Sequence, residues 1–336
     1  MATVDFEDED YSPADLDPPL AAPARTMQLE IPAALAGKRL DQALAELIPG
    51  YSRSRLTTFI REGFVTVDDL PGSGKQRLCG GERVNVTTTP RAEESAFQAE
   101  AVPFPVIHED DAVIVIDKPA GLVVHPAAGN WSGTLLNGLL HHDPHLARLP
   151  RAGIVHRLDK DTSGVMVVAR TEAAQVALVR QLQERTMSRT YLALVRGHLT
   201  GEGRIEAAIG RHPHQRTRMA VRRDDPRAKP AATRYRVVEC TAFHTLVECT
   251  LETGRTHQIR VHMQSAGFPL EGDPVYGPPM TGIDPGVRAT IRAFGRQALH
   301  ARRLAFVHPV SGQKVGYEAP IPADLRDFIA AMRELG

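Results

Sequence analysis

Residues 156–169 read His-Arg-Leu-Asp-Lys-Asp-Thr-Ser-Gly-Val-Met-Val-Val-Ala, a polar loop that runs directly into an apolar strand. Polar loops at the edge of a sheet commonly carry functional residues. Asp159 has a cationic neighbour in sequence on each side, Arg157 and Lys160, and nearby positive charge keeps a carboxylate ionised. A simpler interpretation is that Asp159 and Thr162 merely cap a turn. The residue types favour the simpler interpretation, and both predict an ordered loop before the strand.

Working outward from this strand, the chain from residue 103 to 336 contains more predicted strands than helices. Apolar or alternating stretches predict strands, and helical spacing predicts helices. Because the two do not alternate regularly, we expect an α+β domain with a mixed, largely antiparallel sheet rather than a doubly wound one. The expected strands are 113–117, 164–169, 190–195, 233–239, 245–250 and 303–307, and the expected helices are 172–184, 258–265 and 323–335.

Residues 38–88 predict a second, smaller unit. Leucines at helical spacing end before Pro49-Gly50, which indicates a short amphipathic helix. Ser52 or Ser54 can cap a following helix, and Gly63 suits its C-terminal end. Two short strands on either side of a turn complete the unit.

Two segments outside these units lack the pattern of a core. Residues 1–26 carry seven acidic residues and four prolines, a composition that predicts a disordered tail without a site. Residues 89–102 have no apolar period and are interpreted as a linker. The acidic start is unlike a secretory signal and no apolar run could span a bilayer, so we expect a cytoplasmic protein with no membrane contact.

A second polar segment, residues 253–263, reads Thr-Gly-Arg-Thr-His-Gln-Ile-Arg-Val-His-Met. Its two arginines, Arg255 and Arg260, are five apart and therefore cannot point the same way along a helix. They should have different partners. The alternative is that these are solvated basic residues.

No metal or disulfide site is expected. His257 and His262 are too far apart for a zinc pair on one helix, and Pro144 interrupts the group of His141, His142 and His145. The three cysteines form no C-x-x-C pair and are interpreted as small core residues. They are Cys79, Cys240 and Cys249.

The net charge of zero conceals a basic body. All 40 lysines and arginines, but only 33 of the 40 acidic residues, lie in residues 25–336. Residues 204–236 hold ten basic residues against three acidic ones, enough to bind several phosphates. A second basic group lies on or beside the two short helices of the smaller unit, where a solvated helix surface is an equally good interpretation. It consists of Lys38, Arg39, Arg53, Arg55 and Arg61.

Taken together, these segments resemble the RluA-type pseudouridine synthases, most closely the branch that modifies large-subunit ribosomal RNA. Residues 156–164 match the family signature H-R-L-D-x-x-T-S-G, and residues 117–126, 189–195 and 254–260 match three further motifs in the family's order. The smaller unit resembles an S4 RNA-binding domain. The resemblance covers residues 38–336, and its four ordered motifs make it specific.

The resemblance implies a catalytic role for three residues. It places the catalytic aspartate at Asp159, the active-site tyrosine at Tyr191 and the arginine paired with the aspartate at Arg260, with Arg255 as the second choice. The residues expected to bind the substrate uridine are His156, Arg157, Thr162, Arg255 and His257. The stretch from Tyr276 to Gly286 is not typical of the family, and we expect it to have no bearing on the reaction.

The implied reaction is the isomerisation of uridine to pseudouridine, in which no atom enters or leaves, so no cofactor is expected. The expected partner is large-subunit ribosomal RNA, and the expected oligomeric state is a monomer. Two other classes remain open. A nucleoside or glycoside hydrolase would pair Asp159 with a second carboxylate, for which Asp161 is the obvious candidate. A non-catalytic RNA-binding or ribosome-associated protein would need neither Asp159 nor Tyr191.

Overall fold

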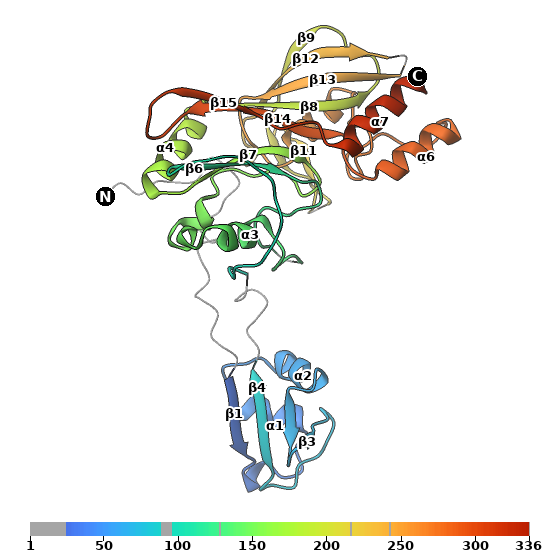
Figure 1. The fold of residues 1–336 in the computed structure, drawn as a ribbon. Coiled ribbons are helices and arrows are strands. Elements are labelled where there is room, and N and C mark those ends of the chain that lie inside the picture. Colours follow the sequence, from blue (N-terminus) through green and yellow to red (C-terminus); the bar gives the residue numbers. More distant parts are fainter. Residues whose placement is uncertain (1–24, 89–95, 128, 216, 242, 336) are drawn as a thin grey trace. The chain divides into compact units, whose positions relative to one another are not determined.

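The computed structural model describes residues 25–88, 96–127, 129–215, 217–241 and 243–335, which divide into two compact units at residues 96 and 97. Each unit has a sheet and an apolar core of its own (Figure 1). The tail expected at residues 1–26 falls almost entirely outside the described residues, as does half of the expected linker. In the described parts of the chain, no helix has the length and apolar character needed to cross a membrane.

The smaller unit is a four-stranded antiparallel sheet, in the order β1-β4-β2-β3, that packs against two helices. Ser52 caps the second helix by accepting a hydrogen bond from the N–H of Arg55, and Gly63, with φ of +83°, follows the end of that helix as expected. The elements are β1 (Arg25–Glu30), α1 (Leu40–Leu47), α2 (Arg53–Arg61), β2 (Val65–Val67), β3 (Leu70–Pro71) and β4 (Arg83–Thr88).

Strand β1 extends this unit beyond the expected boundary at residue 38. It pairs with β4 over six positions, from Arg25 opposite Thr88 to Glu30 opposite Arg83. Met27 and Leu29 alternate along β1 and pack against the core of the unit. Two apolar residues next to an acidic stretch were too weak a pattern to predict a strand.

The larger unit is built on one nine-stranded mixed sheet in the order β5-β6-β7-β14-β8-β13-β12-β9, with β15 paired to β14. All pairs are antiparallel except β7 with β14, so the expected α+β class with a mixed, largely antiparallel sheet is confirmed. The strands are β5 (Val106–Glu109), β6 (Val113–Lys118), β7 (Ser163–Ala169), β8 (Ser188–Arg196), β9 (Glu202–Glu206), β12 (Ala232–Cys240), β13 (His244–Leu251), β14 (Leu299–Val307) and β15 (Lys314–Glu318).

The neighbouring strands β6 and β7 contain continuous apolar runs, 113–116 and 165–169, because both of their faces are buried. Alternate residues of each strand belong to two different cores, so that Val165 and Val167 lie in one core and Met166 and Val168 in the other. At the start of β7, a Cβ on Gly164 would lie 2.1 Å from the carbonyl oxygen of Ala301, and only glycine lets β14 approach so closely.

Five helices cover the larger sheet, two of which were not expected from the sequence. Helix α3 begins with a capping box between Thr134 and Asn137, and α6 begins at an Asp284 cap followed by Pro285. The helices are α3 (Leu135–His142), α4 (Glu172–Gln183), α5 (Gln258–Ser265), α6 (Pro285–Phe294) and α7 (Ala323–Glu334). A separate two-stranded sheet joins β10 (Ile209–Arg211) to β11 (Met219–Val221).

The larger unit also starts earlier than the expected residue 103. Phe97 and Val102 pack against its main core, and Asn137 donates a side-chain hydrogen bond to the carbonyl of Gln98 at 2.8 Å. The described part of the expected linker is therefore held on the larger unit.

Candidate active site

One pocket of the larger unit brings together segments that are more than 100 residues apart in the sequence. Its walls come from the loop before β7, from β8, from the end of β13, from the turn leading into α5 and from the start of β14. All eight residues expected to be catalytic or to bind the substrate line this pocket. They are His156, Arg157, Asp159, Thr162, Tyr191, Arg255, His257 and Arg260.

The loop that carries Asp159 is tied down from several sides. A turn closes where the N–H of Thr162 donates to the carbonyl of Asp159 at 3.0 Å, and Gln297 donates to the Thr162 hydroxyl, also at 3.0 Å. Arg296 donates to the carbonyl of Asp161 at 3.1 Å. The turn that Asp159 and Thr162 were expected to cap is thus present. Backbone groups close it, so the Asp159 carboxylate remains available for the pocket.

Lys118, at the end of β6, is a fully buried support of this loop. Its ammonium donates to the carbonyls of Pro119, Leu122 and Lys160 at 2.8 to 2.9 Å, which satisfies its three N–H groups. Burial lowers the pKa of Lys118 to about 7, against the opposing charges of Asp161 and Asp159. This lysine therefore joins the 118–122 segment to the loop that carries Asp159.

Asp159 pairs with Arg260 and not with Arg255. Arg260 donates from Nη1 to Asp159 Oδ2 at 2.9 Å, whereas Arg255 donates from Nε to the carbonyl of Pro230 at 3.2 Å. The expectation that the two arginines have different partners is confirmed. The Asp159 side chain is 20% exposed and that of Arg260 only 5% exposed, so the pair lies at the base of the pocket.

Arg260 makes a bidentate contact with a second carboxylate, Asp273. Arg260 donates from Nε and Nη2 to the two oxygens of Asp273 at 2.7 and 2.8 Å. Although burial acts in the opposite direction, the hydrogen bonds to Asp273 and the charge of Asp159 raise the pKa of Arg260. Asp273 was not singled out from the sequence, where its signal was an acidic residue in a Gly-Asp-Pro turn.

His257 approaches Asp159 from the other side, with Nε2 3.9 Å from Oδ1. It stands at the N-cap of α5 with φ of +57°, a backbone conformation that is uncommon outside glycine. Burial lowers the pKa of His257 although Asp159 acts in the opposite direction, so the neutral ring is favoured.

The Tyr276 hydroxyl contacts the other ring nitrogen of His257, Nδ1. The distance from His257 Nδ1 to the Tyr276 hydroxyl is 2.8 Å, and the same hydroxyl accepts from the N–H of Met219 at 2.7 Å. If the hydroxyl donates its proton to Nδ1, the proton of the neutral His257 ring lies on Nε2, toward Asp159. Tyr276, the first residue of the stretch expected to have no bearing on the reaction, therefore contacts a residue that lines the pocket.

Tyr191 and His156 occupy the part of the pocket next to the sheet. Tyr191 is 6% exposed on β8. His156 is buried, and its Nε2 accepts from the N–H of Val167 at 3.2 Å. Burial, with the nearby charge of Arg189, lowers the pKa of His156 to about 3, so this ring is neutral and supports β7.

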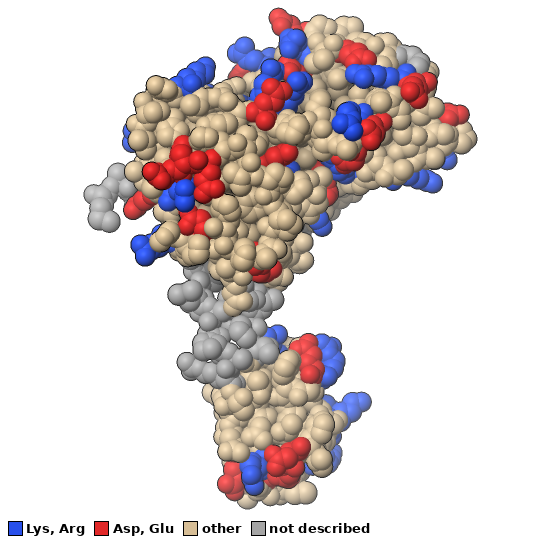
Figure 2. All heavy atoms as spheres, viewed as in Figure 1, with Lys and Arg blue, Asp and Glu red and all other residues tan. Residues whose placement is uncertain are grey.

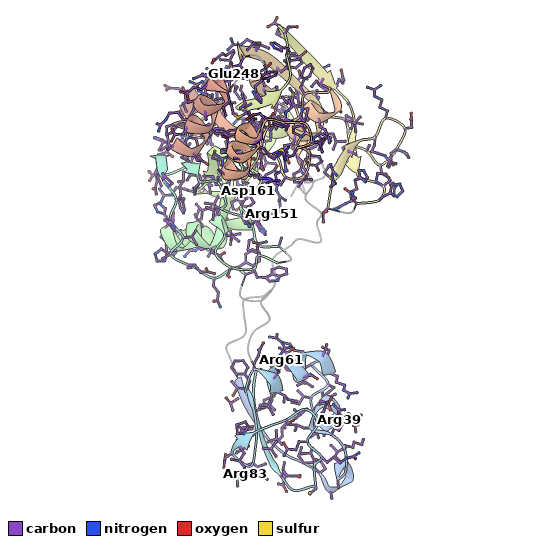
Figure 3. All side chains as sticks on the ribbon, turned by 90° about the vertical axis from the view of Figure 1, so that its right-hand side faces the viewer. Arg39, Arg61, Arg83, Arg151, Asp161 and Glu248 are labelled. Atoms are coloured by element: carbon purple, nitrogen blue, oxygen red, sulfur yellow. The ribbon has the colours of Figure 1, made fainter. Side chains whose placement is uncertain are left out.

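Seven of the ten basic residues at 204–236 fall into two groups. On the sheet, Arg204 and Arg234 pair with Glu252, and Arg236 pairs with Glu248. This group lies away from the loop that carries Asp159, since Glu248 and Asp161 are well separated in Figure 3. Acidic and basic side chains are intermixed on the face of the larger unit seen in Figure 2.

The other group surrounds a hollow beside β10 and β11. Its described lining includes a single acidic residue, Asp225, which pairs with Arg222 and Arg227. Arg255 lines both this hollow and the pocket of Asp159, so the two are adjacent. The basic residues of the hollow are Arg211, Arg222, Arg227, Lys229 and Arg255.

In the smaller unit, acidic residues lie among the five expected RNA-binding residues. Asp41 accepts from both Arg39 and Arg53, and Lys38 donates to Glu46 at 2.6 Å. Arg61 is 4.0 Å from Glu62, and the Arg55 guanidinium lies 4.6 Å from the Phe59 ring centroid. Basic side chains are spread over the whole smaller unit. In Figure 3, Arg61 lies at one end of the unit and Arg83, which is not one of the five, lies at the other.

The structure bears on three interpretations made from the sequence: a hydrolase, a metal site and buried cysteines. Asp161, the companion carboxylate needed by a hydrolase, is not among the described residues that line the pocket. His142 bonds Glu109 at 2.9 Å, and no group of three potential metal ligands occurs in the described ranges. Of the cysteines, Cys249 is buried, whereas Cys79 and Cys240 are exposed, so the core interpretation is right for Cys249 alone.

Comparison with known proteins identifies one family. Residues 112–265 match the sequence profile described as "RNA pseudouridylate synthase". The chain is 52% identical over 338 residues to ribosomal large subunit pseudouridine synthase D of Neisseria meningitidis, covering 99% of this chain and 89% of that protein. The protein of the same name from Nitrosomonas europaea is 54% identical over 310 residues, covering 92% and 89%.

A solved structure shows the same similarity in three dimensions. Human RNA pseudouridylate synthase domain containing 1 superimposes with a TM-score of 0.53 at 27% identity, covering 67% of this chain and 86% of the human chain.

Proposed function

The chain belongs to the RNA pseudouridylate synthase family, and from this premise we propose that it converts specific uridines of large-subunit ribosomal RNA to pseudouridine, with Asp159 as the nucleophile. The observation that carries the proposal is the Asp159 carboxylate, 2.9 Å from Arg260 Nη1, in a pocket that Tyr191 also lines. The RNA class is taken from the names of the bacterial relatives.

The reaction breaks the N1–C1′ bond, rotates the uracil and joins C1′ to C5, after which C5 loses its proton. The substrate and product contain the same atoms, so the site needs a nucleophile, a route for one proton and a wall that retains the detached base. Asp159 supplies the carboxylate, which attacks the substrate either at the sugar or at C6 of the uracil. Leu158, Leu251 and Leu299 supply apolar walls around it.

Two side chains are suited to handling the base and its proton. Tyr191 can stack on the uracil ring, and its hydroxyl is the nearest candidate for moving the C5 proton. His257, neutral and with its Nε2 proton toward Asp159, can hold a uracil oxygen or the carboxylate as the base rotates.

A uridine within a helix is inaccessible, so the RNA must present it outside the stack. Arg157 is exposed beside Asp159, where it can fill the place that the uridine leaves. The basic hollow next to Arg255 can bind the flanking phosphates. We assign residues 25–88 as an S4-like RNA-binding unit whose Lys38, Arg39, Arg53, Arg55 and Arg61 add weaker contacts to the backbone.

Because its substrate is ribosomal RNA, we place the enzyme in the cytoplasm, and we propose that it acts as a monomer.

The test is to treat large-subunit RNA transcripts with the purified protein and to analyse the product. Isomerisation leaves the RNA mass unchanged and creates a base that reacts with carbodiimide. Loss of uracil would identify a hydrolase, and unchanged RNA after stable binding would identify a non-catalytic protein. Mapping pseudouridines in RNA from cells lacking the protein identifies the uridines concerned.

A further inference from the structure

We propose that Asp273 is a positioning residue of the active site, which aims Arg260 so that Asp159 receives one hydrogen bond and keeps its other oxygen for the substrate. This inference rests on the proposed role of Asp159. It concerns the turn after α5, at residues 271–276.

The Asp273 side chain is completely buried and uses both oxygens. Besides the two hydrogen bonds from Arg260, its Oδ1 accepts from the backbone N–H groups of Val275 and Tyr276 at 2.8 and 2.9 Å. Burial raises the pKa of Asp273, but Arg260 and these N–H groups outweigh it and hold the pKa below its ordinary value. Asp273 is therefore a carboxylate held rigidly to its own turn.

The consequence for Arg260 is geometric. A guanidinium is planar, so two hydrogen bonds from Nε and Nη2 to one carboxylate fix the direction of the remaining Nη1. That direction leads to Asp159 Oδ2. No described residue donates a hydrogen bond to Asp159 Oδ1, which faces His257 Nε2 at 3.9 Å.

The consequence for Asp159 is electrostatic. If Asp273 were neutral, Arg260 could turn its bidentate edge to Asp159, and a carboxylate bound on both oxygens by a full positive charge is a poor nucleophile. With Asp273 charged, one cation is shared between two anions, and Asp159 is oriented without being neutralised.

The turn itself is anchored independently of the pocket. Glu271, two residues before Asp273, is fully buried and accepts from Arg196 Nη2 at 2.9 Å, with His244 Nε2 3.2 Å away. The same turn ends at Tyr276, which holds His257. Both groups that approach Asp159 are thus held by one short segment.

The test is a double-mutant cycle of Asp273→Asn and Arg260→Met, read by turnover per folded enzyme and by melting temperature. Asparagine keeps the shape and can still accept from the N–H groups of Val275 and Tyr276. In the wild-type background, we expect kcat to fall by up to ~100-fold, as for a misplaced catalytic group, with RNA affinity nearly unchanged. In the Arg260→Met background, the same change should cost almost nothing further in kcat.

The melting temperature shows whether the two side chains are coupled in the folded protein, and kcat separates positioning from a merely structural role. Asp273→Asn should destabilise the wild-type protein by leaving Arg260 with one anion, but it should stabilise the Arg260→Met protein by removing an unpaired buried carboxylate. A matched control is Asp143→Asn, because Asp143 is also a buried carboxylate that accepts from an arginine, Arg170, and from a backbone N–H. It does not line the pocket and should lower only the melting temperature.

The inference is overturned if Asp273→Asn keeps wild-type kcat, or if its losses add fully to those of Arg260→Met. It is also overturned if the two substitutions change the melting temperature additively. Asp159→Asn separates this failure from a failure of the proposed function. An active Asp159→Asn enzyme refutes the role of Asp159, whereas an inactive one beside a fully active Asp273→Asn enzyme refutes only the role of Asp273.

Discussion

Each unit of this protein contains a cluster of arginine and aspartate side chains, but the ratio of arginine to aspartate is opposite in the two units. In the larger unit, one buried guanidinium, Arg260, lies between two carboxylates, Asp159 and Asp273. In the smaller unit, one carboxylate, Asp41, lies between Arg39 and Arg53, whose side chains are 39% and 50% exposed.

The difference shows what each cluster can do. A buried, doubly bonded guanidinium cannot change partners without leaving a charge unpaired, at a cost of several kcal/mol, so it fixes a direction. Arg39 and Arg53 are partly exposed, so they can reach an RNA phosphate while they remain beside the buried Asp41 carboxylate. The first arrangement suits chemistry on one atom, and the second suits adjustable contact with a backbone.

Asp159→Asn should give the largest effect. The amide keeps the shape of the side chain and loses the nucleophilic charge, so we expect no detectable turnover and an RNA affinity within a few fold of wild type. Turnover is measured as carbodiimide-reactive base formed per enzyme. Retention of even about a tenth of wild-type turnover would remove Asp159 from the catalytic role.

Arg260→Met should follow, with a loss of at least ~100-fold in rate, because Asp159 loses a preorganised electrostatic partner. Arg255→Met is the matched control from the same turn and should cost less in turnover and more in affinity, since Arg255 faces the basic hollow. If the two arginines gave the opposite order in single-turnover rates, the geometry of the buried cluster would not govern catalysis.

Tyr191→Phe keeps the aromatic face and removes the hydroxyl, so it separates stacking from proton transfer. We expect a loss of about 10-fold or more in turnover, at the C5 deprotonation or at release from Asp159, with RNA binding retained. Release of tritium from RNA labelled at uridine C5 measures the proton step directly. An unchanged release rate would leave Tyr191 with a packing role.

Removing residues 1–95 tests the smaller unit. The two units have separate cores, so the larger unit should remain folded and active, with lower affinity. If the exposed arginines and Lys38 meet about three phosphates, the slope of log affinity against log salt should become shallower by ~2 to 3 units, at ~0.7 to 0.9 per contact. The same slope in both proteins would show that the smaller unit does not touch RNA.

Asp41→Asn should give the smallest effect and the most direct test of the comparison. It releases Arg39 and Arg53 for RNA, so affinity at low salt should rise modestly and kcat should not change. Glu46→Gln, which releases Lys38, is the matched control. Weaker RNA binding by Asp41→Asn, at an unchanged melting temperature, would mean that Asp41 orders these arginines for RNA instead of competing with it.

The sequence predicted the parts of the fold and site that have a dense local pattern. Strands β6 and β7 contain continuous apolar runs, and α5 has helical spacing. Except for Leu251 and Leu299, the described residues that line the pocket lie in the quoted motifs. The sequence did not predict β1, whose apolar side chains in the core are only Met27 and Leu29, because a strand that short depends on its partner.

The same reason applies to Asp273. Nothing in a Gly-Asp-Pro turn indicates that its carboxylate reaches back 13 residues to Arg260. The spacing of Arg255 and Arg260 predicted only that they have different partners, and the choice of Arg260 came from its position in the motif that resembles the family's. Arg260 donates hydrogen bonds to two carboxylates at once because distant segments of the chain pack together, and only the structure shows this.

The strand order also sets when the enzyme can start to work during its own synthesis. Strand β14 lies between β7, which follows the Asp159 loop, and β8, which carries Tyr191. Its residues are made more than 100 positions after Tyr191, so the nascent chain has both reactive side chains long before the sheet can join them. The pocket can therefore form only after β14 has been synthesised, and a chain that ends before β14 lacks the strand that joins the two side chains.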